Sequence, residues 1–442
     1  MKGKHRWRAM DHFLQTVFPI GHLRGWAEHA LRLTIGGEEL LYLRFQCRVG
    51  ETESRIMPLP DYQQGSIVNL MSSIVTALGG ESVLYPPLPE AEKANLGDDR
   101  NVVLFVIDGL GYEYLTRKGQ DTTLGQYLCS RITSVFPTTT ASAITTFFTG
   151  CAPQQHALTG WFTYFKAIDS VAAVLPFRAR ATWVSLRELG LEPDAVFDQP
   201  SVFQQLNAAS YLVLPDRIID SEYTLAHSGP AERRAFVSLS DCFQCIHNIL
   251  CEQTGRKYIY AYWSELDALA HMFGVDSPQV SDHFTELDAA FAAFLSRIQD
   301  NRTTVIVTAD HGFVDSKPEE IIQLADHPEL AETLMKPLCG EPRVAYCYVH
   351  PKKRDQFEIY VTTKMSEYVS LFRSEELVSA GYFGLGDPHP ELFERIGDYV
   401  LITKQRYVIK DRLPGEHAYR HVGAHGGVSD EEMYVPLIIA NL

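Results

Sequence analysis

The sequence has no long uninterrupted run of apolar residues. A helix needs roughly 18 to 20 such residues to span a bilayer, and the longest candidates, such as Val102 to Ile107, end at an Asp or another polar residue. We therefore expect no membrane span. The basic start of the chain is followed by Asp11, His12 and Gln15, which interrupt the apolar core that a signal peptide requires. A cytoplasmic protein is expected.

Cysteine and positive charge are also scarce. The 8 cysteines in 442 residues are far below the density of a disulfide scaffold. The cluster of Cys242, Cys245 and Cys251 has a helical pattern and no second pair at zinc-finger spacing, so we expect ordinary helix thiols. The formal net charge of −16 disfavours binding to polymeric nucleic acid or to an anionic membrane. A small phosphate stays compatible, because metal ions bring their own positive charge.

The composition that remains is that of a globular protein, with 45% hydrophobic and 21% charged residues. Short runs of branched and aromatic residues predict four buried parallel strands at Asn101 to Ile107, Tyr258 to Trp263, Thr303 to Thr308 and Tyr434 to Ala440. Helical patterns lie between them, for example at Ser142 to Thr149 and His283 to Ile298. This alternation predicts an α/β fold with a doubly wound, mainly parallel sheet.

The segments outside these strands predict how the chain is divided. Two strand-like runs, Ala30 to Thr34 and Leu40 to Phe45, flank a turn with two glycines, so residues 1–60 are predicted to form a small antiparallel β appendage. Residues 61–442 are predicted to form the main domain. Within it, the stretches at about 161–255 and 317–420 carry no comparable motif. We expect them to be cap insertions over the site.

Two of the predicted strands end in groups that suit a metal ion. One strand runs into Asp108 and a glycine, and another runs into Asp310, His311 and a glycine. Ligands of open α/β sheets bind at the carboxyl ends of the strands, and a carboxylate with an imidazole suits zinc, manganese or iron. Taken singly, each motif is also explained by a polar turn or a helix cap that follows a strand.

A run of hydroxyl residues precedes one predicted helix. Residues 136–142 read Phe-Pro-Thr-Thr-Thr-Ala-Ser and lead into a helix of small residues that reaches Gly150. Free N–H groups and the helix dipole would hold a phosphate there, and a metal ion on a hydroxyl would make it an alkoxide nucleophile. Taken alone, the run is better explained by a threonine that caps the helix.

Two further motifs supply histidines. Asp267 and His271 are four residues apart and share one face if the chain turns helically after its strand. That spacing chelates one metal ion or makes an ordinary surface pair. Before the final strand, glycines around His425 allow close backbone approach and make it the best ligand candidate of its segment. His421 either supports a ligand from behind or is simply exposed.

Together the motifs bring three Asp, three His and one Thr to strand ends of a single predicted sheet. Coincidence of five such motifs is improbable, so a metal site is favoured over a purely structural arrangement. The motifs resemble those of the alkaline phosphatase superfamily, specifically its type I phosphodiesterase/nucleotide pyrophosphatase branch. The matching segments are Ile107-Asp108-Gly109, the Pro-Thr-x-Thr run that ends at Thr140, Asp267-x-x-x-His271, Asp310-His311-Gly312 and His425-Gly426.

The resemblance implies an alkaline-phosphatase-like fold with two divalent metal ions, zinc being the usual family metal and manganese the alternative. It implies that one ion is held by Asp267, His271 and His425, and the other by Asp108, Asp310, His311 and the hydroxyl of Thr140, which is the implied nucleophile. The branch usually places an Asn shortly after the nucleophile helix to bind a phosphoryl oxygen. Trp161 stands at that position, which leaves the choice between diesters and monoesters open.

The implied activity is hydrolysis of phosphate esters, of the phosphodiesterase or nucleotide pyrophosphatase type, through a phosphothreonine intermediate. The implied substrate is a small phosphorylated molecule, with nucleotides among the candidates. One alternative is a phosphomonoesterase or phosphotransferase of the same superfamily. Another is a non-catalytic binding domain on the same fold, against which the intact Thr140 and the complete set of ligands argue.

Overall fold

The computed structural model describes residues 29–35, 38–44, 57–81, 84–97, 99–252, 255–299, 301–416 and 421–442. The chain divides into two compact units, Met1–Met57 and Pro58–Leu442. In the first unit, β1 (His29–Ile35) pairs with β2 (Glu38–Arg44) in an antiparallel hairpin. The assignment of residues 1–60 as an appendage stays a prediction, because most of these residues lie outside the described part of the chain.

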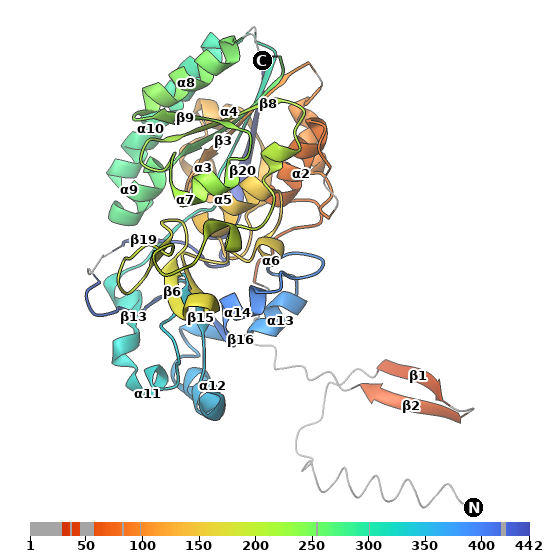
Figure 1. Ribbon diagram of the computed structural model, residues 1–442, viewed down its shortest axis with the longest axis vertical. Helices are drawn as coiled ribbons and strands as arrows, with labels where there is room; N and C mark the ends of the chain where they lie inside the picture. Colours follow the sequence, from red (N-terminus) through yellow and green to blue (C-terminus); the bar gives the residue numbers. More distant parts are fainter. Residues whose placement is uncertain are drawn as a thin grey trace, which may run out of the picture. The chain divides into compact units, whose positions relative to one another are not determined.

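A sheet of seven strands forms the centre of the second unit, in the order β4-β20-β11-β3-β10-β8-β9 (Figure 1). Its strands are β3 (Asn101–Ile107), β4 (Leu128–Thr133), β8 (Ala209–Pro215), β9 (Glu232–Phe236), β10 (Lys257–Trp263), β11 (Thr303–Thr308) and β20 (Tyr434–Asn441). The neighbours from β11 to β9 all pair in parallel. The predicted α/β fold with a mainly parallel sheet is confirmed.

The predicted direction of the last strand is wrong. β20 pairs antiparallel to both of its neighbours, β11 and β4. The chain enters β20 from the loop that contains His425, and this loop lies where the parallel strands end. A strand that starts at that edge has to run back across the sheet. Because a continuous apolar run reports burial and not direction, the sequence pattern could not reveal this.

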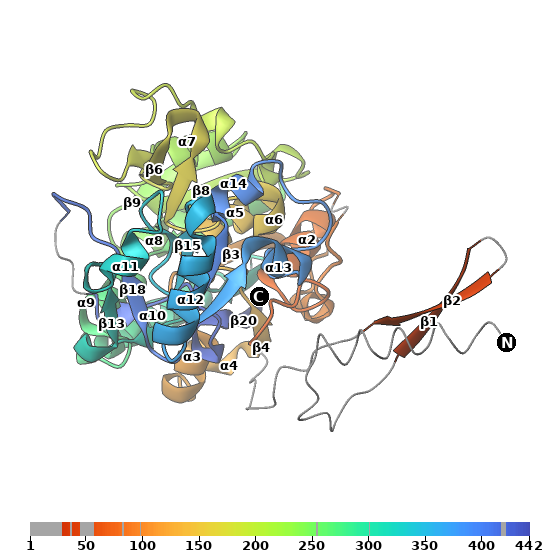
Figure 2. The ribbon, with the colours of Figure 1, turned by 90° about the horizontal axis from the view of Figure 1, so that it is seen from below.

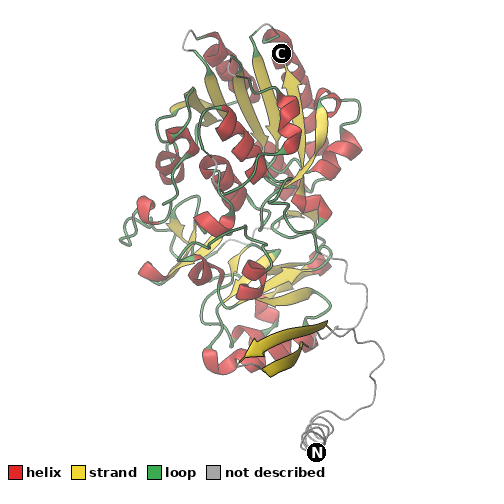
Figure 3. Cartoon of the chain, turned by 90° about the vertical axis from the view of Figure 1, so that its right-hand side faces the viewer, coloured by secondary structure: helices red, strands yellow, loops and turns green. Residues whose placement is uncertain are grey.

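Helices cover both faces of the main sheet, which gives three layers (Figures 1 and 3). One face carries α8 (Leu239–Cys251), α9 (Glu265–Phe273) and α10 (Pro278–Arg297), and the other carries α2 (Ile67–Ala77) and α5 (Thr140–Thr149). The predicted helix Ser142 to Thr149 lies within α5, and the predicted helix His283 to Ile298 lies within α10 except for its last residue, the C-cap. Shorter helices in the same part of the chain are α3 (Tyr112–Lys118), α4 (Thr123–Gln126), α6 (Pro153–His156), α7 (Glu222–His227) and α15 (Asp430–Met433).

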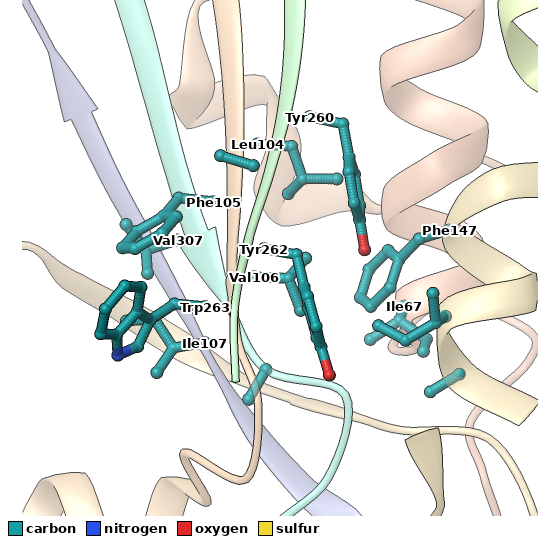
Figure 4. Packing of buried hydrophobic residues seen from close by; sticks show 14 of the residues in the cluster. Ile67, Leu104, Phe105, Val106, Ile107, Phe147, Tyr260, Tyr262, Trp263 and Val307 are labelled. Atoms are coloured by element: carbon teal, nitrogen blue, oxygen red, sulfur yellow. The ribbon is translucent and has the colours of Figure 1, made fainter. Parts of the chain in front are cut away.

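The core has a separate set of side chains on each face of the sheet, because successive residues of a strand point to opposite sides. Figure 4 shows Tyr260 and Tyr262 on the side of Phe147, and Trp263 on the opposite side with Phe105. The ring of Phe105 lies 5.3 Å from that of Phe243 on α8, between centroids. All of these side chains are buried. Rigid packing on both faces fixes the strand ends from which the site is built.

A second sheet lies next to the carboxyl edge of the main sheet (Figure 1). Its order is β16-β17-β15-β14-β5-β6-β7. Its strands are β5 (Phe162–Phe165), β6 (Ser170–Ala173), β7 (Arg178–Ala179), β14 (Cys339–Gly340), β15 (Val344–Cys347), β16 (Val369–Arg373) and β17 (Tyr399–Thr403). Its helices are α11 (Pro328–Ala331), α12 (Arg354–Lys364), α13 (Ser374–Ser379) and α14 (Leu392–Ile396). Figure 2 shows α12 on the side away from the main sheet.

Two short strand pairs complete the described sheets. β12 (Val314–Asp315) pairs with β19 (Gly423–Ala424), and β13 (Ile321–Gln323) pairs with β18 (Val408–Lys410). The predicted helix thiols lie on α8, where Cys242 is buried and Cys251 is exposed. Among the described residues, no helix has the length and apolar character to cross a bilayer.

The stretch 161–255, expected to be a cap, belongs to both sheets. Its first part, β5 to β7, joins the second sheet beside the site, but β8, β9 and α8 are part of the main sheet. β9 reads Glu-Arg-Arg-Ala-Phe and forms the edge of the main sheet. Because β9 is polar and no ligand motif follows it, its sequence does not indicate that it belongs to the main sheet.

Candidate active site

The structure brings all seven candidate side chains to the carboxyl edge of the main sheet. Asp108 follows β3, and Asp310 and His311 follow β11. Asp267 and His271 lie on α9, one helical turn apart, as the spacing of four residues predicts. The remaining two are Thr140, the first residue of α5, and His425, which follows β19. Five separate chain segments therefore converge on one place.

One group of side chains surrounds the imidazole of His311. Its Nε2 lies 3.2 Å from Oγ1 of Thr140, 3.4 Å from Oδ1 of Asp108 and 3.5 Å from Oδ2 of Asp310. The histidine and both aspartates are buried, and Thr140 is half-buried. This group combines two carboxylates, an imidazole and a hydroxyl.

A second group lies beside the first. Nε2 of His271 is 3.1 Å from Nε2 of His425 and 3.5 Å from Oδ1 of Asp267. Nε2 of His425 lies 4.0 Å from the same oxygen. The ring of His425 stacks on that of His311, with 3.7 Å between their centroids. Contact between these two rings places the groups directly side by side.

The aspartates keep one oxygen for the site and bind the protein with the other. Oδ2 of Asp108 accepts a hydrogen bond from the hydroxyl of Tyr262. Oδ1 of Asp310 accepts from the backbone N–H groups of Gly109 (3.1 Å) and His311 (3.0 Å). The opposite oxygens of these two aspartates, and Oδ1 of Asp267, are buried without a hydrogen-bond partner among the described residues. Three buried orphan acceptors that face one site call for a cation.

Each of the three histidines likewise binds the protein with one ring nitrogen and leaves the other for the site. Nδ1 of His271 lies 2.9 Å from the carbonyl of Gly423, and Nδ1 of His425 lies 3.1 Å from that of Thr138. His311 directs its Nδ1 to the carbonyl of Gly312 at 3.2 Å. Because a carbonyl only accepts, each Nδ1 carries the proton and each Nε2 offers a lone pair to the site.

These distances fit divalent metal ions. Metal–ligand bonds of about 2.0–2.2 Å at a tetrahedral centre place neighbouring ligand atoms roughly 3.3–3.6 Å apart, close to the separations in both groups. The lone pairs of His271 and His425 face each other at 3.1 Å, an arrangement that repels unless a cation lies between them. Mixed carboxylate and imidazole ligands are those of zinc or manganese.

Burial sets the protonation of the same residues. It raises the pKa of Asp108, and the nearby charges of Asp267 and Asp310 raise it further. Burial likewise raises the pKa of Asp267 to about 7 and lowers the pKa of His271 to about 4. The pKa of His425 is lowered well below its usual value by burial and by the neighbouring imidazoles. Protons are therefore poor substitutes for a metal ion on the histidines.

Comparison with family models identifies the chain. Residues 102–428 match the model of the type I phosphodiesterase / nucleotide pyrophosphatase family. The chain belongs to this family. A comparison of the sequence with curated proteins found no match. The matched range contains every candidate site residue, since the first is Asp108 and the last is His425.

Solved structures show the same fold. Murine ectonucleotide pyrophosphatase / phosphodiesterase 5 aligns with a TM-score of 0.58 at 18% identity, over 76% of this chain and 87% of its own. Phosphonoacetate hydrolase from Sinorhizobium meliloti 1021, in complex with phosphonoacetate, aligns with a TM-score of 0.57 at 17% identity, over 77% of this chain and 90% of its own. An inactive variant of the murine protein was solved in complex with AMP. The predicted alkaline-phosphatase-like fold is confirmed.

The start of α5 leaves backbone donors for a ligand. Thr139 occupies the N-cap position, yet its side chain makes no capping hydrogen bond. Its hydroxyl donates instead to Oε1 of Glu341 at 2.6 Å. The explanation of this run as a side-chain cap is therefore wrong. Because the N–H groups of a first helical turn lack acceptors within the helix, those beside Thr140 can bind an anion.

Two glycines permit the close approach of these segments. Gly109, directly after Asp108, has a φ of 76°, and a Cβ there would lie 2.5 Å from the ring of Phe313. Gly426, directly after His425, has a φ of 109°, and its Cβ would lie 2.6 Å from Cβ of Glu341. Both backbone conformations are strained for other residues. The glycines therefore help to position the two candidate ligands, Asp108 and His425.

Two residues at the site had no sequence signal of their own. Tyr262 reads as one more aromatic residue in a buried strand, and only the pairing of β10 with β3 shows that its hydroxyl reaches Asp108. Glu341 is a single acid in a turn of the second sheet. Because Glu341 is far in sequence from every motif, its position beside Thr139 could not be predicted.

His421 and Trp161 take peripheral positions. The ring centroid of His421 lies 4.6 Å from that of His271. The sequence left two alternatives for His421, support of a ligand or simple exposure. The structure shows both, because His421 contacts His271 and is exposed. Trp161 is half-buried, and its backbone N–H donates to Glu341 at 2.6 Å.

Proposed function

We propose that this protein hydrolyses phosphate esters of small molecules, with two divalent metal ions and Thr140 as the nucleophile. The observation that carries the proposal is the clustering of three orphan carboxylate oxygens and three imidazole Nε2 atoms in two adjacent groups, one of which includes the Thr140 hydroxyl. Membership of the phosphodiesterase/nucleotide pyrophosphatase family supports the reaction class. Phosphodiesters and nucleoside pyrophosphates are the proposed substrates.

The two groups of side chains would each hold one ion. Asp267, His271 and His425 form one set of ligands, and Asp108, Asp310, His311 and Thr140 form the other. Zinc is the proposed metal and manganese the alternative. Bound there, the ions would lower the pKa of the Thr140 hydroxyl and neutralise charge on the phosphate oxygens.

Thr140 would then carry out the reaction in two steps. Its hydroxyl loses the proton to solvent, and Oγ1 attacks phosphorus while the bond from phosphorus to the leaving oxygen breaks. The product of this step is phosphothreonine, which still carries the second ester group of the phosphorus when the substrate is a diester or a pyrophosphate. Water then attacks phosphorus on the opposite side from Oγ1 and gives up a proton to solvent, and the bond to Oγ1 breaks while Oγ1 takes up a proton and regenerates the threonine. Backbone N–H groups at the start of α5 would stabilise the negative oxygens in both steps.

Trp161 leaves the choice between diesters and monoesters open. Trp161 gives its backbone N–H to Glu341 and brings no side-chain amide to the phosphoryl group. A phosphomonoesterase or phosphotransferase activity of the same site is the corresponding alternative.

A cytoplasmic location stays a prediction.

A substrate panel on matched variants tests the proposal. The zinc-loaded protein, Thr140→Ala and Thr140→Ser would be assayed on a nucleoside pyrophosphate, an aryl phosphodiester, a phosphomonoester and a phosphonate. We expect Thr140→Ala to lose at least about 10³-fold in kcat with unchanged zinc content, and Thr140→Ser to keep measurable activity. Full activity of Thr140→Ala would refute the assignment of Thr140 as the nucleophile. A zinc-loaded wild type that turns over none of these substrates would favour a binding domain.

A further inference from the structure

The turn between β14 and β15 joins the second sheet to both sides of the site. Glu341 and Arg343 lie in this turn. Glu341 binds the segment that precedes Thr140, as described above. Arg343 binds Glu432 through two hydrogen bonds of 2.9 and 2.7 Å, and Glu432 accepts the N–H of Gly427 at 2.7 Å. One turn thus contacts the nucleophile segment and the loop that follows His425.

Glu341 is an unusual residue for this position. It is 7% exposed, and one of its oxygens, Oε1, receives both the Thr139 hydroxyl and the Trp161 N–H at 2.6 Å. Both donors are neutral. Burial raises the pKa of Glu341 to about 7, and the hydrogen bonds from Thr139 and Trp161 oppose that rise. A buried carboxylate with only neutral partners is costly, which calls for a reason to keep it.

The geometry supplies such a reason. Thr139 is the residue directly before Thr140, and it is the N-cap of α5. A hydrogen bond from its side chain to Glu341 fixes its rotamer and the entry of the chain into the helix. The same bond keeps the Thr139 hydroxyl from capping the first turn, so the N–H groups there stay available to a phosphoryl group.

We propose that Glu341 is a positioning residue for the nucleophile. Its carboxylate holds Thr139 and the Trp161 backbone together, and this link sets the direction of the Thr140 hydroxyl and keeps the start of α5 open. Glu341 acts through Thr139 and does not itself bind metal. The inference rests on the proposed hydrolysis, because it assigns a role within that reaction.

A purely structural link makes different predictions. If Glu341 only stabilised the fold, its loss would lower the melting temperature or the zinc content, and activity would fall in proportion. A positioning residue changes kcat at constant zinc content and constant KM, because it affects the alignment of Thr140 and not the affinity for substrate.

The test compares four substitutions in the zinc-loaded full chain. Glu341→Met keeps the size of the side chain and removes the acceptor, whereas Glu341→Gln keeps an acceptor oxygen. Thr139→Val removes the donor, and Asp398→Asn is a control in the second sheet, where Asp398 likewise accepts a backbone N–H, from Val349 at 2.9 Å. kcat, KM, zinc content and melting temperature would be measured for each, with the double variant of Glu341→Met and Thr139→Val.

We expect Glu341→Met and Thr139→Val each to lower kcat by roughly 10- to 100-fold, a loss common for groups that orient catalytic residues. The double variant should lose no more than either single one, because both break the same link. Glu341→Gln and Asp398→Asn should stay near wild type in kcat. Thr139→Val carries the test by itself if Glu341→Met fails to fold.

Several results would overturn the inference. Wild-type kcat in Thr139→Val, additive losses in the double variant, or losses that follow zinc content would each refute the positioning role. A loss in Glu341→Gln as large as in Glu341→Met would refute the hydrogen bond as its basis. An inactive wild type would refute the proposed function itself and the inference with it, so the two failures are distinct.

Discussion

Five of the seven proposed ligands are oriented by an atom that does not face the site. The three histidines give Nδ1 to backbone carbonyls, and Asp310 gives Oδ1 to backbone N–H groups. Asp108 is the exception, since a side chain, the hydroxyl of Tyr262, holds its second oxygen. Such contacts fix the direction of a ligand before the metal binds. Only the contact to Asp108 can be removed by substitution of a side chain.

Tyr262→Phe should therefore weaken one metal ion selectively. The substitution leaves the buried ring in place and removes the donor to Asp108. We expect about 10- to 100-fold weaker binding of the ion held by Asp108, Asp310 and His311, with the other ion nearly unaffected. Metal titration with a competing chelator would measure both affinities. Tyr260→Phe, in the same strand and equally buried, is the matched control. Equal affinities in wild type and Tyr262→Phe would contradict this account of Asp108.

Elements of structure differ in how far the sequence predicts them. The strands before Asp108 and Asp310 were predictable because a strand buried on both faces is a continuous apolar run. The shared face of Asp267 and His271 was expected only if a helix followed the strand, and α9 is that helix. The direction of β20 was not predictable, because it depends on where the chain comes from and not on its own residues.

The second sheet escaped prediction for a related reason. Its strands are only two to five residues long, too short to show a period. They also pair over large sequence distances, as Gly340 with Phe162 does. Glu341 depends on this pairing, so no local pattern could assign it to the site. The candidate ligands could be identified from sequence motifs, whereas Glu341, which binds the segment before Thr140, could be identified only from the fold.

The buried ion pair between Arg343 and Glu432 should stabilise the turn and the loop that it joins. The two side chains are 2% and 0% exposed. Arg343→Met leaves the carboxylate of Glu432 buried without its partner, and we expect a loss of about 3–5 kcal/mol in the free energy of unfolding. Unfolding in urea would measure it. Arg373→Met, which breaks an exposed pair with Glu358, should change stability little. Equal effects of the two substitutions would contradict a structural role of the buried pair.

The molecule as a whole brings one site together from two sheets. The main sheet and its helices supply the ligands and Thr140, and the second sheet supplies Glu341 and Arg343. Asp108, Asp267 and Asp310 gather at this site without an ion pair to a Lys or Arg among the described residues, so the metal-free protein stores unfavourable interactions that metal ions would relieve. Stability and metal binding should therefore be coupled.

That coupling should depend on pH through Asp267. Its pKa of about 7 in the folded, metal-free protein lies above the value of about 3.9 expected in the unfolded chain. The folded state thus retains a proton that the unfolded state has lost, and this contribution to stability disappears as pH rises through 7. Metal ions bind the ionised carboxylate, so they compete with this proton below pH 7.

We therefore expect the melting temperature of the zinc-loaded protein to exceed that of the chelated protein by a margin that grows from about pH 5 to about pH 8. Scanning calorimetry of both forms across this range would measure the margin. The histidines do not offset the trend, because burial lowers the pKa of His271 to about 4. A margin that stays constant or shrinks with rising pH would contradict the assignment of Asp267 as a ligand.

Anomalous X-ray scattering from crystals of the zinc-loaded protein tests the central claim most directly. The account predicts two zinc peaks. One lies about 2.0–2.2 Å from side-chain atoms of Asp267, His271 and His425, and the other at the same distance from Asp108, Asp310, His311 and Oγ1 of Thr140. Zinc bound elsewhere, or Oγ1 of Thr140 beyond reach of either ion, would contradict it.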